Sequence, residues 1–213
     1  MTQSPLTRAA SRAVATLALG AAAVTTLGGC APLIVGGVMA GGALMVIDRR
    51  TSGTQIEDQT IELKAASRIR DLATFGHVNV TSYNRIVLLS GEVPTEEDKR
   101  RVEDAVARVD QVKTVVNELE VMANSSLTSR SNDSLLSTKV KATLVDAKDL
   151  QAPAIKVVTE RGIVYLMGIV TEREANRSAD LIATVPGVRK VVKAFEVISE
   201  NELAGIQSRS TPR

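Results

Sequence analysis

Three kinds of side chain in this sequence are candidates for chemistry: a single histidine, a single cysteine and a short run of acids. His77 stands in a predicted turn, and no spacing around it matches a metal site, a phosphate loop or an activated nucleophile. The run Glu96-Glu97-Asp98 could be mistaken for paired catalytic carboxylates. It follows Thr95, however, and predicts the capped first turn of a helix, where acids favour the helix dipole. We therefore expect no catalytic residue, no metal, no cofactor and no enzymatic activity.

Cys30, the only cysteine, follows a segment with the features of an export signal. Arg8 and Arg12 supply its positive end, and an apolar run leads to Leu27-Gly28-Gly29-Cys30, which is similar to the lipobox of bacterial lipoproteins. The segment predicts a signal peptide over residues 1–29 and attachment of lipid to Cys30. An uncleaved membrane helix with a chance cysteine is the alternative. An exported chain with one cysteine forms no internal disulfide.

By resemblance to bacterial lipoproteins, Cys30 would carry three acyl chains, and two or more chains anchor a protein stably. Ala31 follows, where an aspartate would retain such a protein in the inner membrane. The resemblance therefore implies an outer-membrane protein that faces the periplasm. Residues 31–47 are apolar but contain two glycine pairs, and as a helix they would be about 25 Å long, short of the roughly 30 Å hydrocarbon core. We expect a tether over residues 30–53 that lies along the membrane, with a second membrane span as the alternative.

The rest of the chain contains the same unit twice. Ile86-Val87-Leu88-Leu89-Ser90-Gly91 corresponds to Ile163-Val164-Tyr165-Leu166-Met167-Gly168 at an offset of 77 residues, and the helix starts and valine-rich segments that follow also correspond. The repeat predicts this division: a first domain at 54–121, a serine-rich linker at 122–131, a second domain at 132–198 and a disordered tail at 199–213.

Each copy predicts the order helix, strand, strand, helix, strand. Apolar residues at helical spacing come first, and two short apolar runs joined by a tight turn then predict an antiparallel hairpin. A right-handed crossover from the second strand to the third places both helices on one face of a three-stranded mixed sheet, which is an α+β fold. Gly91 and Gly168 are expected to have a structural role, permitting a sharp strand exit or a close helix approach.

The two copies differ in charge. Residues 58–121 contain 12 acidic and 9 basic side chains, net −3, whereas residues 132–198 contain 8 acidic and 10 basic, net +2. The second copy is therefore the one suited to an anionic surface. The whole chain has a net charge of +2, and removal of the signal peptide with its two arginines would bring the mature chain to about zero. Neither this charge nor export favours a nucleic-acid partner.

Leu135, in the first helix of the second copy, lies off the predicted core-facing stripe. Thr138, Lys139 and Ala142 share its flank, and the matching position in the first copy is the polar Thr60. A leucine outside the core and beside a lysine can insert at a lipid interface while the ammonium group approaches phosphate. An ordinary, partly exposed leucine, or one packed against the other domain, is the alternative.

The strand that ends in glycine, the helix after it and the exit Val185-Pro186-Gly187-Val188 resemble the BON family of small bacterial envelope domains, over roughly residues 58–198. Together with the N-terminus, the chain resembles outer-membrane lipoproteins that contain two such domains. The resemblance implies a role in envelope integrity and binding of anionic phospholipid, such as phosphatidylglycerol or cardiolipin, by the first helix of the second domain. Carried over to this chain, the contact residues are Leu135, Thr138, Lys139 and Lys141. The family has a large aromatic at the position of Leu135, which implies weaker insertion here.

A protein-interaction adaptor is the rival function. BON domains also occur in envelope assemblies such as secretins, so a protein complex or peptidoglycan is the alternative partner to phospholipid. In that case Leu135 would lie beneath the other domain or beneath a partner. Self-association through an exposed sheet edge is a third possibility.

Overall fold

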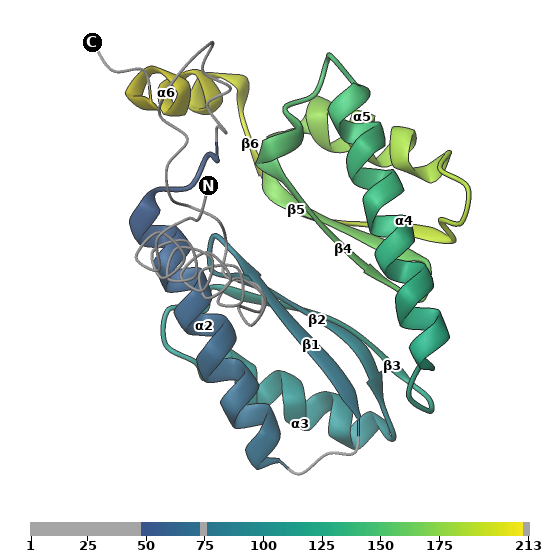
Figure 1. Cartoon of the computed structure of the whole chain (residues 1–213). Coiled ribbons are helices and arrows are strands. Elements are labelled where there is room, and N and C mark those ends of the chain that lie inside the picture. The colour runs from purple at the N-terminus through teal and green to yellow at the C-terminus, as the bar shows by residue number, and fades with distance from the viewer. Residues whose placement is uncertain (1–47, 73–75, 211–213) are drawn as a thin grey trace, which may run out of the picture. The chain divides into compact units, whose positions relative to one another are not determined.

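The computed structural model describes residues 48–72 and 76–210, with side chains as far as residue 208 (Figure 1). These residues belong to one compact unit, 45–213. The predicted signal peptide at 1–29, Cys30 and the apolar part of the predicted tether, 31–47, lie outside the described residues. Within the described ranges, no helix has both the length and the apolar content needed to cross a bilayer.

The first repeat folds in the predicted order. Its elements are α2 (Ser52–Asp71), β1 (His77–Tyr83), β2 (Ile86–Val93), α3 (Glu96–Ala107) and β3 (Thr114–Val121). Strand β2 is central, antiparallel to β1 and parallel to β3. Thr51 and Thr95 begin the two helices, because the side chain of each accepts a hydrogen bond from a backbone N–H three residues on.

The second repeat has the same topology. Its elements are α4 (Leu127–Asp146), the short 3-10 helix η2 (Ala152–Ala154), β4 (Ile155–Glu160), β5 (Ile163–Thr171), α5 (Glu172–Ala183) and β6 (Lys190–Ile198). Strand β5 is central, antiparallel to β4 and parallel to β6. A capping box between Thr171 and Glu174 begins α5. The predicted fold class, two α+β copies of one unit, is confirmed.

In each repeat an aliphatic core lies between the two helices and one face of the sheet (Figure 1). The helical residues of the first core are Ile61, Ala65, Ile69, Val102 and Val106. Those of the second are Leu136, Val140, Leu144, Ala175 and Ile182. The apolar stripe of the first helix in each repeat is therefore the one that helical periodicity predicts.

The other faces of the two sheets pack against each other. A third buried cluster joins Tyr83 and Leu88 of the first repeat to residues of the second, namely Ile163, Tyr165, Met167, Ile169 and Ala194. Both faces of β5 are therefore covered, and all of its residues are buried. This burial explains why the sequence of β5 is a continuous apolar run and does not alternate with polar residues.

Helices extend into two segments that were predicted to lack them. Helix α4 begins at Leu127, inside the predicted linker, because the Ser126 hydroxyl accepts a hydrogen bond from the backbone N–H of Ser129. Helix α6 (Glu200–Ser210) occupies most of the predicted disordered tail. Ser199 and Glu202 form a capping box at its start, and Leu203 is buried. This cap and the burial of Leu203 stabilise α6.

The two repeat glycines lie inside strands, which differs from the predicted strand exit or close helix approach. Gly91 has a φ of +112°, and a Cβ added there would lie 2.0 Å from the carbonyl oxygen of His77. At Gly168 the same atom would lie 2.4 Å from the carbonyl oxygen of Ala154. In both repeats the glycine makes room for the backbone on the other side of the hairpin.

Candidate functional site

Helix α4 contains all four predicted contact residues and turns one side away from the core. Its buried residues are Asp133, Leu136, Val140 and Leu144. Leu135 is 64 % exposed, and Thr138, Lys139 and Lys141 are exposed as well. The alternative in which Leu135 packs against the other domain is therefore wrong.

An uncharged stripe, which we call the α4 stripe, runs along the outer side of this helix. Its members are Leu127, Ser131, Leu135, Thr138, Ala142 and Val145, all exposed. At 3.6 residues per turn these positions fall within roughly 80° of arc. Leu127 and Val145 are 79 % and 71 % exposed, so large apolar side chains lie near both ends. The sequence prediction omits these two because it places Leu127 in the linker and follows the flank only to Ala142.

Lys139 and Lys141 flank the α4 stripe on opposite sides, each roughly 40° outside it. Within the described residues, neither ammonium group has a carboxylate partner. The acids of α4 are Asp133, which is buried, and Asp146, which is exposed at the end of the helix. The structure therefore places Leu135, Thr138 and Lys139 together, whereas Lys141 lies on the other flank.

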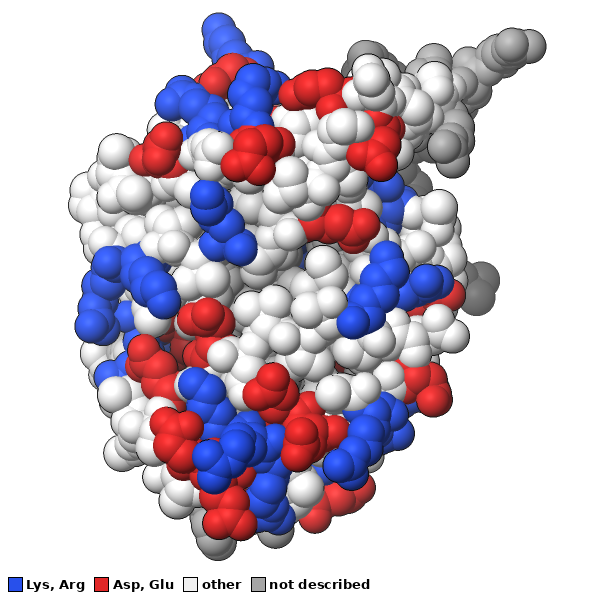
Figure 2. All heavy atoms as spheres, turned by 180° about the vertical axis from the view of Figure 1, so that it is seen from behind, with Lys and Arg blue, Asp and Glu red and all other residues white. Residues whose placement is uncertain are grey.

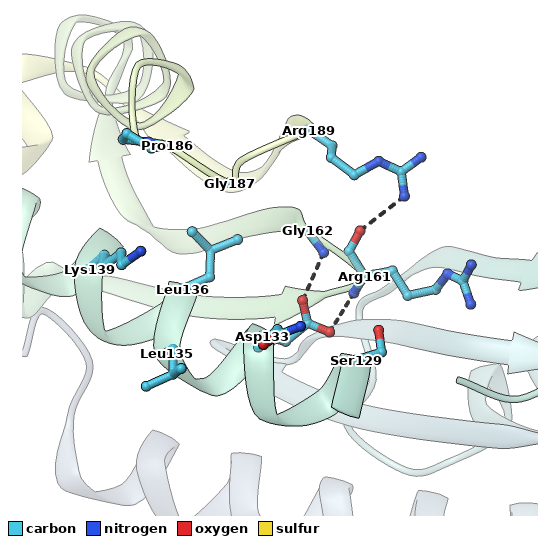
Figure 3. Close-up of a pocket in the computed structure, with 11 residues that line it drawn as sticks. Ser129, Asp133, Leu135, Leu136, Lys139, Arg161, Gly162, Pro186, Gly187 and Arg189 are labelled. Atoms are coloured by element: carbon cyan, nitrogen blue, oxygen red, sulfur yellow. Dashed lines mark hydrogen bonds between the residues drawn. The ribbon is translucent and has the colours of Figure 1, made fainter. Parts of the chain in front are cut away.

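On the Lys139 side, a pocket of about 400 Å³ lies between α4 and the loop before β6 (Figure 3). Asp133 lines it, and its carboxylate accepts hydrogen bonds from the backbone N–H groups of Arg161 and Gly162, both at 2.8 Å. Arg189 lines it from the loop and donates to the carbonyl oxygen of Arg161 at 3.3 Å. Lys139 and Arg189 line this pocket together, and neither forms an ion pair with a carboxylate of the described residues.

On the Lys141 side, a second pocket of about 480 Å³ has a mostly apolar lining. Its apolar residues are Leu144, Val145, Ala152, Pro153, Ile155 and Val157. Lys156 also lines it, but its ammonium group bonds Glu62 at 3.2 Å. Asp48 and Arg50, the start of the described chain, line the same pocket as Lys141. Chain that lies far from α4 in the sequence therefore lies beside it in space.

His77 begins β1, although the sequence prediction places it in a turn. Its ring nitrogen lies 3.2 Å from the side-chain nitrogen of Asn79, and burial lowers the pKa of the imidazole. Asn79 also donates to Glu160 at 2.8 Å, and burial raises the pKa of that carboxyl. The Asn79–Glu160 hydrogen bond joins the two repeats. Nowhere in the described ranges do three His, Cys, Asp or Glu side chains cluster as a metal site would require.

The face shown in Figure 2 has Lys and Arg side chains interspersed with Asp and Glu. A mixed surface of this kind gives little long-range attraction to a polyanion.

Comparison with known proteins identifies the repeats. The BON domain family matches residues 57–123 and 132–199, which together make up more than half of the chain. The chain belongs to the BON-domain family. The two BON domains coincide with the two repeats, and α4 is the first helix of the second BON domain.

Two relatives extend this comparison beyond the BON domains. The outer membrane lipoprotein DolP of Haemophilus influenzae is 37 % identical over 201 residues, which cover 93 % of this chain and 100 % of that protein. A 21 kDa hemolysin of Actinobacillus pleuropneumoniae is 30 % identical over 155 residues, covering 71 % and 80 %. The first relative confirms the predicted resemblance to outer-membrane lipoproteins with two BON domains, and with it the lipid-anchored location in the outer membrane.

Among solved structures, the C-terminal domain of CdsD, the structural protein of the type III secretion system of Chlamydia trachomatis, aligns with 70 % of this chain and 100 % of its own. The identity is 13 % and the TM-score 0.28. A likeness at this level carries no argument about function.

Proposed function

We propose that the second BON domain binds anionic phospholipid through the α4 stripe and its two lysines, and that the protein supports envelope integrity in this way without turning over a substrate. The observation that supports this is the stripe itself: Leu127, Leu135 and Val145 are each more than half exposed, and unpaired lysines lie on both flanks. Apolar side chains between cations suit the boundary between acyl chains and phosphate.

The magnitudes fit a weak contact that an anchor reinforces. Burying one leucine or valine contributes about 1.5–3 kcal/mol, and one lysine near an anionic surface contributes about 1 kcal/mol. Such a face gives reversible binding on its own. Acyl chains on Cys30 would hold the protein at the membrane and keep the α4 stripe at high local concentration near the lipid.

Vesicle co-sedimentation tests the proposal. The unit 45–213, which lacks the anchor, should bind vesicles that contain phosphatidylglycerol or cardiolipin and should leave neutral phosphatidylcholine vesicles unbound. Binding should weaken as salt rises, because salt screens the attraction between exposed lysines and phosphate. No binding to anionic vesicles, together with retention of one stoichiometric envelope protein or of peptidoglycan, would favour the adaptor function.

Lipid attachment at Cys30 has a separate test. Mass spectrometry of the native mature N-terminus should find an acylated Cys30 as the first residue. A mature chain that still begins at residue 1 without modification would contradict the lipoprotein assignment for this chain.

A further inference from the structure

The three residues that follow the apolar stretch 31–47, Asp48-Arg49-Arg50, are held by both BON domains. The guanidinium of Arg49 is buried and forms a two-pronged ion pair with Glu174 of α5, with N–O distances of 2.7 and 2.8 Å. The same guanidinium donates to the carbonyl oxygen of Ile169 in β5 at 2.7 Å. The neighbouring residue, Arg50, turns to the other domain.

Arg50 donates to Asp58 of α2 at 2.7 Å and lies 4.0 Å over the ring of Tyr83. Asp48 accepts from the same guanidinium at 2.8 Å. Asp58 in turn accepts from the backbone N–H groups of the β1–β2 turn. Arg49 therefore binds the second domain, and Arg50 binds the first. We call the segment Asp48-Arg49-Arg50 the clasp, because it fixes the chain to both domains.

The contact with Glu174 is specific to the second domain. Glu174 is the acid of the α5 capping box, and burial alone would raise the pKa of its carboxyl. The hydrogen bonds from Arg49 and from the N–H of Thr171 lower that pKa instead, so the ion pair is charged at neutral pH. The corresponding residue of the first domain, Asp98, is bonded within its own helix and its cap.

The clasp lies beside α4. Asp48 and Arg50 line the same pocket as Lys141 and Val145. Lys141 flanks the α4 stripe, and Val145 lies at one end of it. The 17 residues 31–47 could extend to roughly 60 Å, so a tether alone would leave the domains free to turn in any direction. The clasp, where the described chain begins, fixes the chain to the domains next to the candidate lipid-binding face.

We propose that the clasp orients the domains so that the α4 stripe faces the same leaflet that holds the acyl chains. This inference rests on the proposed function and adds the surface that is bound. The acyl chains and the α4 stripe of one molecule would contact the same leaflet. Two linked contacts reinforce each other only where the geometry allows both at once, and the clasp supplies that geometry.

The experiment uses the full lipidated chain in vesicles that contain phosphatidylglycerol and a lipid-borne fluorescence quencher. A fluorophore on Ser134→Cys, an exposed α4 position beside the stripe, should be quenched in the wild-type background. The same fluorophore on Ala107→Cys of α3 is the control label. The combined change Arg49→Met and Glu174→Gln removes the ion pair but keeps a residue that can complete the capping box, and quenching at position 134 should fall at least twofold.

Two controls separate the clasp from its surroundings. Four Gly and Ser residues inserted between Ile47 and Asp48 lengthen the tether while leaving the clasp intact, so quenching at position 134 should persist. Arg49→Lys, which keeps the charge but not the two-pronged contact, should give an intermediate loss. The proposed role of the clasp would be wrong if quenching at position 134 survived the combined change. It would also be wrong if the insertion reduced that quenching as much as the combined change does.

The proposed function is read out separately in the unit 45–213. This unit with Arg49→Met and Glu174→Gln should still bind anionic vesicles within twofold of the unchanged unit. If the unchanged unit binds and the anchored wild type shows no quenching at position 134, the orientation is wrong and the lipid-binding function stands. If the unchanged unit does not bind, the proposed function fails and the inference fails with it.

Discussion

Helices α2 and α4 are the same element in the two BON domains, yet their outer sides differ in a way that exposed apolar area does not reveal. The outer side of α2 also has large exposed apolar residues, Ile56 at 65 % and Leu63 at 74 %. The difference lies in the charges beside them. Lys64 of α2 pairs with Asp110 at 3.1 Å, whereas its counterpart Lys139 of α4 has no carboxylate partner among the described residues.

The other flank shows the same contrast. The position of Lys141 in α4 is Ala66 in α2, and α2 has Glu57 and Glu62 where α4 has Asn132 and Ser137. An apolar stripe beside acids and paired lysines suits water or a protein surface, while one between free cations suits an anionic interface. The comparison teaches that free charge beside the stripe, more than the stripe itself, distinguishes the two domains.

The largest expected effect comes from placing a charge in the α4 stripe. Leu135→Asp should weaken binding of the unit 45–213 to phosphatidylglycerol vesicles about 30-fold, because it loses about 2 kcal/mol of apolar burial and brings an anion to an anionic surface. The matched control is Leu63→Asp in α2, which should change binding less than twofold. Co-sedimentation over a range of lipid concentrations measures both. Equal losses of vesicle binding in the two variants would show that α2 and α4 contribute equally to binding.

Reversing a lysine beside the stripe should have the next largest effect. Lys139→Glu should reduce binding about tenfold at low salt, since one attraction of about 1 kcal/mol is lost and a repulsion is added. Lys64→Glu in α2 is the control and should have little effect on vesicle binding, because that lysine is already paired. Raising the salt concentration should bring the Lys139→Glu variant and the wild type together. A difference that salt does not alter would argue against headgroup contact.

These predictions depend on features that the sequence shows to different degrees. Repetition and helical spacing predict both α+β copies, the cores around Ile61 and Leu136, and the exposed position of Leu135, because local spacing determines which side of a helix faces its own sheet. The same spacing would have found Val145, and the Ser199–Glu202 pattern of a capping box would have found α6.

The clasp could not be predicted in this way. Arg49 and Glu174 are 125 residues apart, and their contact depends on how two separately predictable domains pack. The sheet faces that join the domains are apolar in each copy, and no periodicity states what covers them. A charged triplet after an apolar stretch is also typical of the end of a membrane-proximal segment, so Asp48-Arg49-Arg50 gives no local sign of burial.

The equivalent aspartates Asp58 and Asp133 give the next comparison. Both accept hydrogen bonds from the turn of their hairpin, but Asp58 also receives Arg50 and the Ser82 hydroxyl. Asp58→Asn should therefore lower the free energy of unfolding at pH 7 by about 1 kcal/mol more than Asp133→Asn. Denaturant titration of the unit 45–213 measures both. An equal loss would mean that Arg50 adds no stability through this carboxylate.

The pH dependence of stability should distinguish Asp58→Asn from the wild type. Burial alone would raise the pKa of the Asp58 carboxyl, but its hydrogen bonds lower it below the ordinary 3.8. A depressed pKa contributes stability that is present above the pKa of the unfolded chain and is lost as the pH falls through the folded-state value. Below about pH 4, wild type should therefore lose more free energy of unfolding than Asp58→Asn does. If the free energies of unfolding of the wild type and of Asp58→Asn fall in parallel with pH, the Asp58 carboxylate does not contribute this stability.

The smallest expected effect is a gain of binding built into α2. In a Leu135→Asp background, Thr60→Leu and Asp110→Asn would give α2 the two features that distinguish α4, an apolar residue at the matching position and a free Lys64. Binding to anionic vesicles should recover two- to threefold, or about 0.5 kcal/mol. Recovery should stop well short of wild type because Ala66 offers no second cation. Thr60→Leu alone, which leaves Lys64 paired, should recover less. If it recovers as much, apolar exposure would outweigh free charge, and the distinction between the two domains would have to rest on Leu127 and Val145.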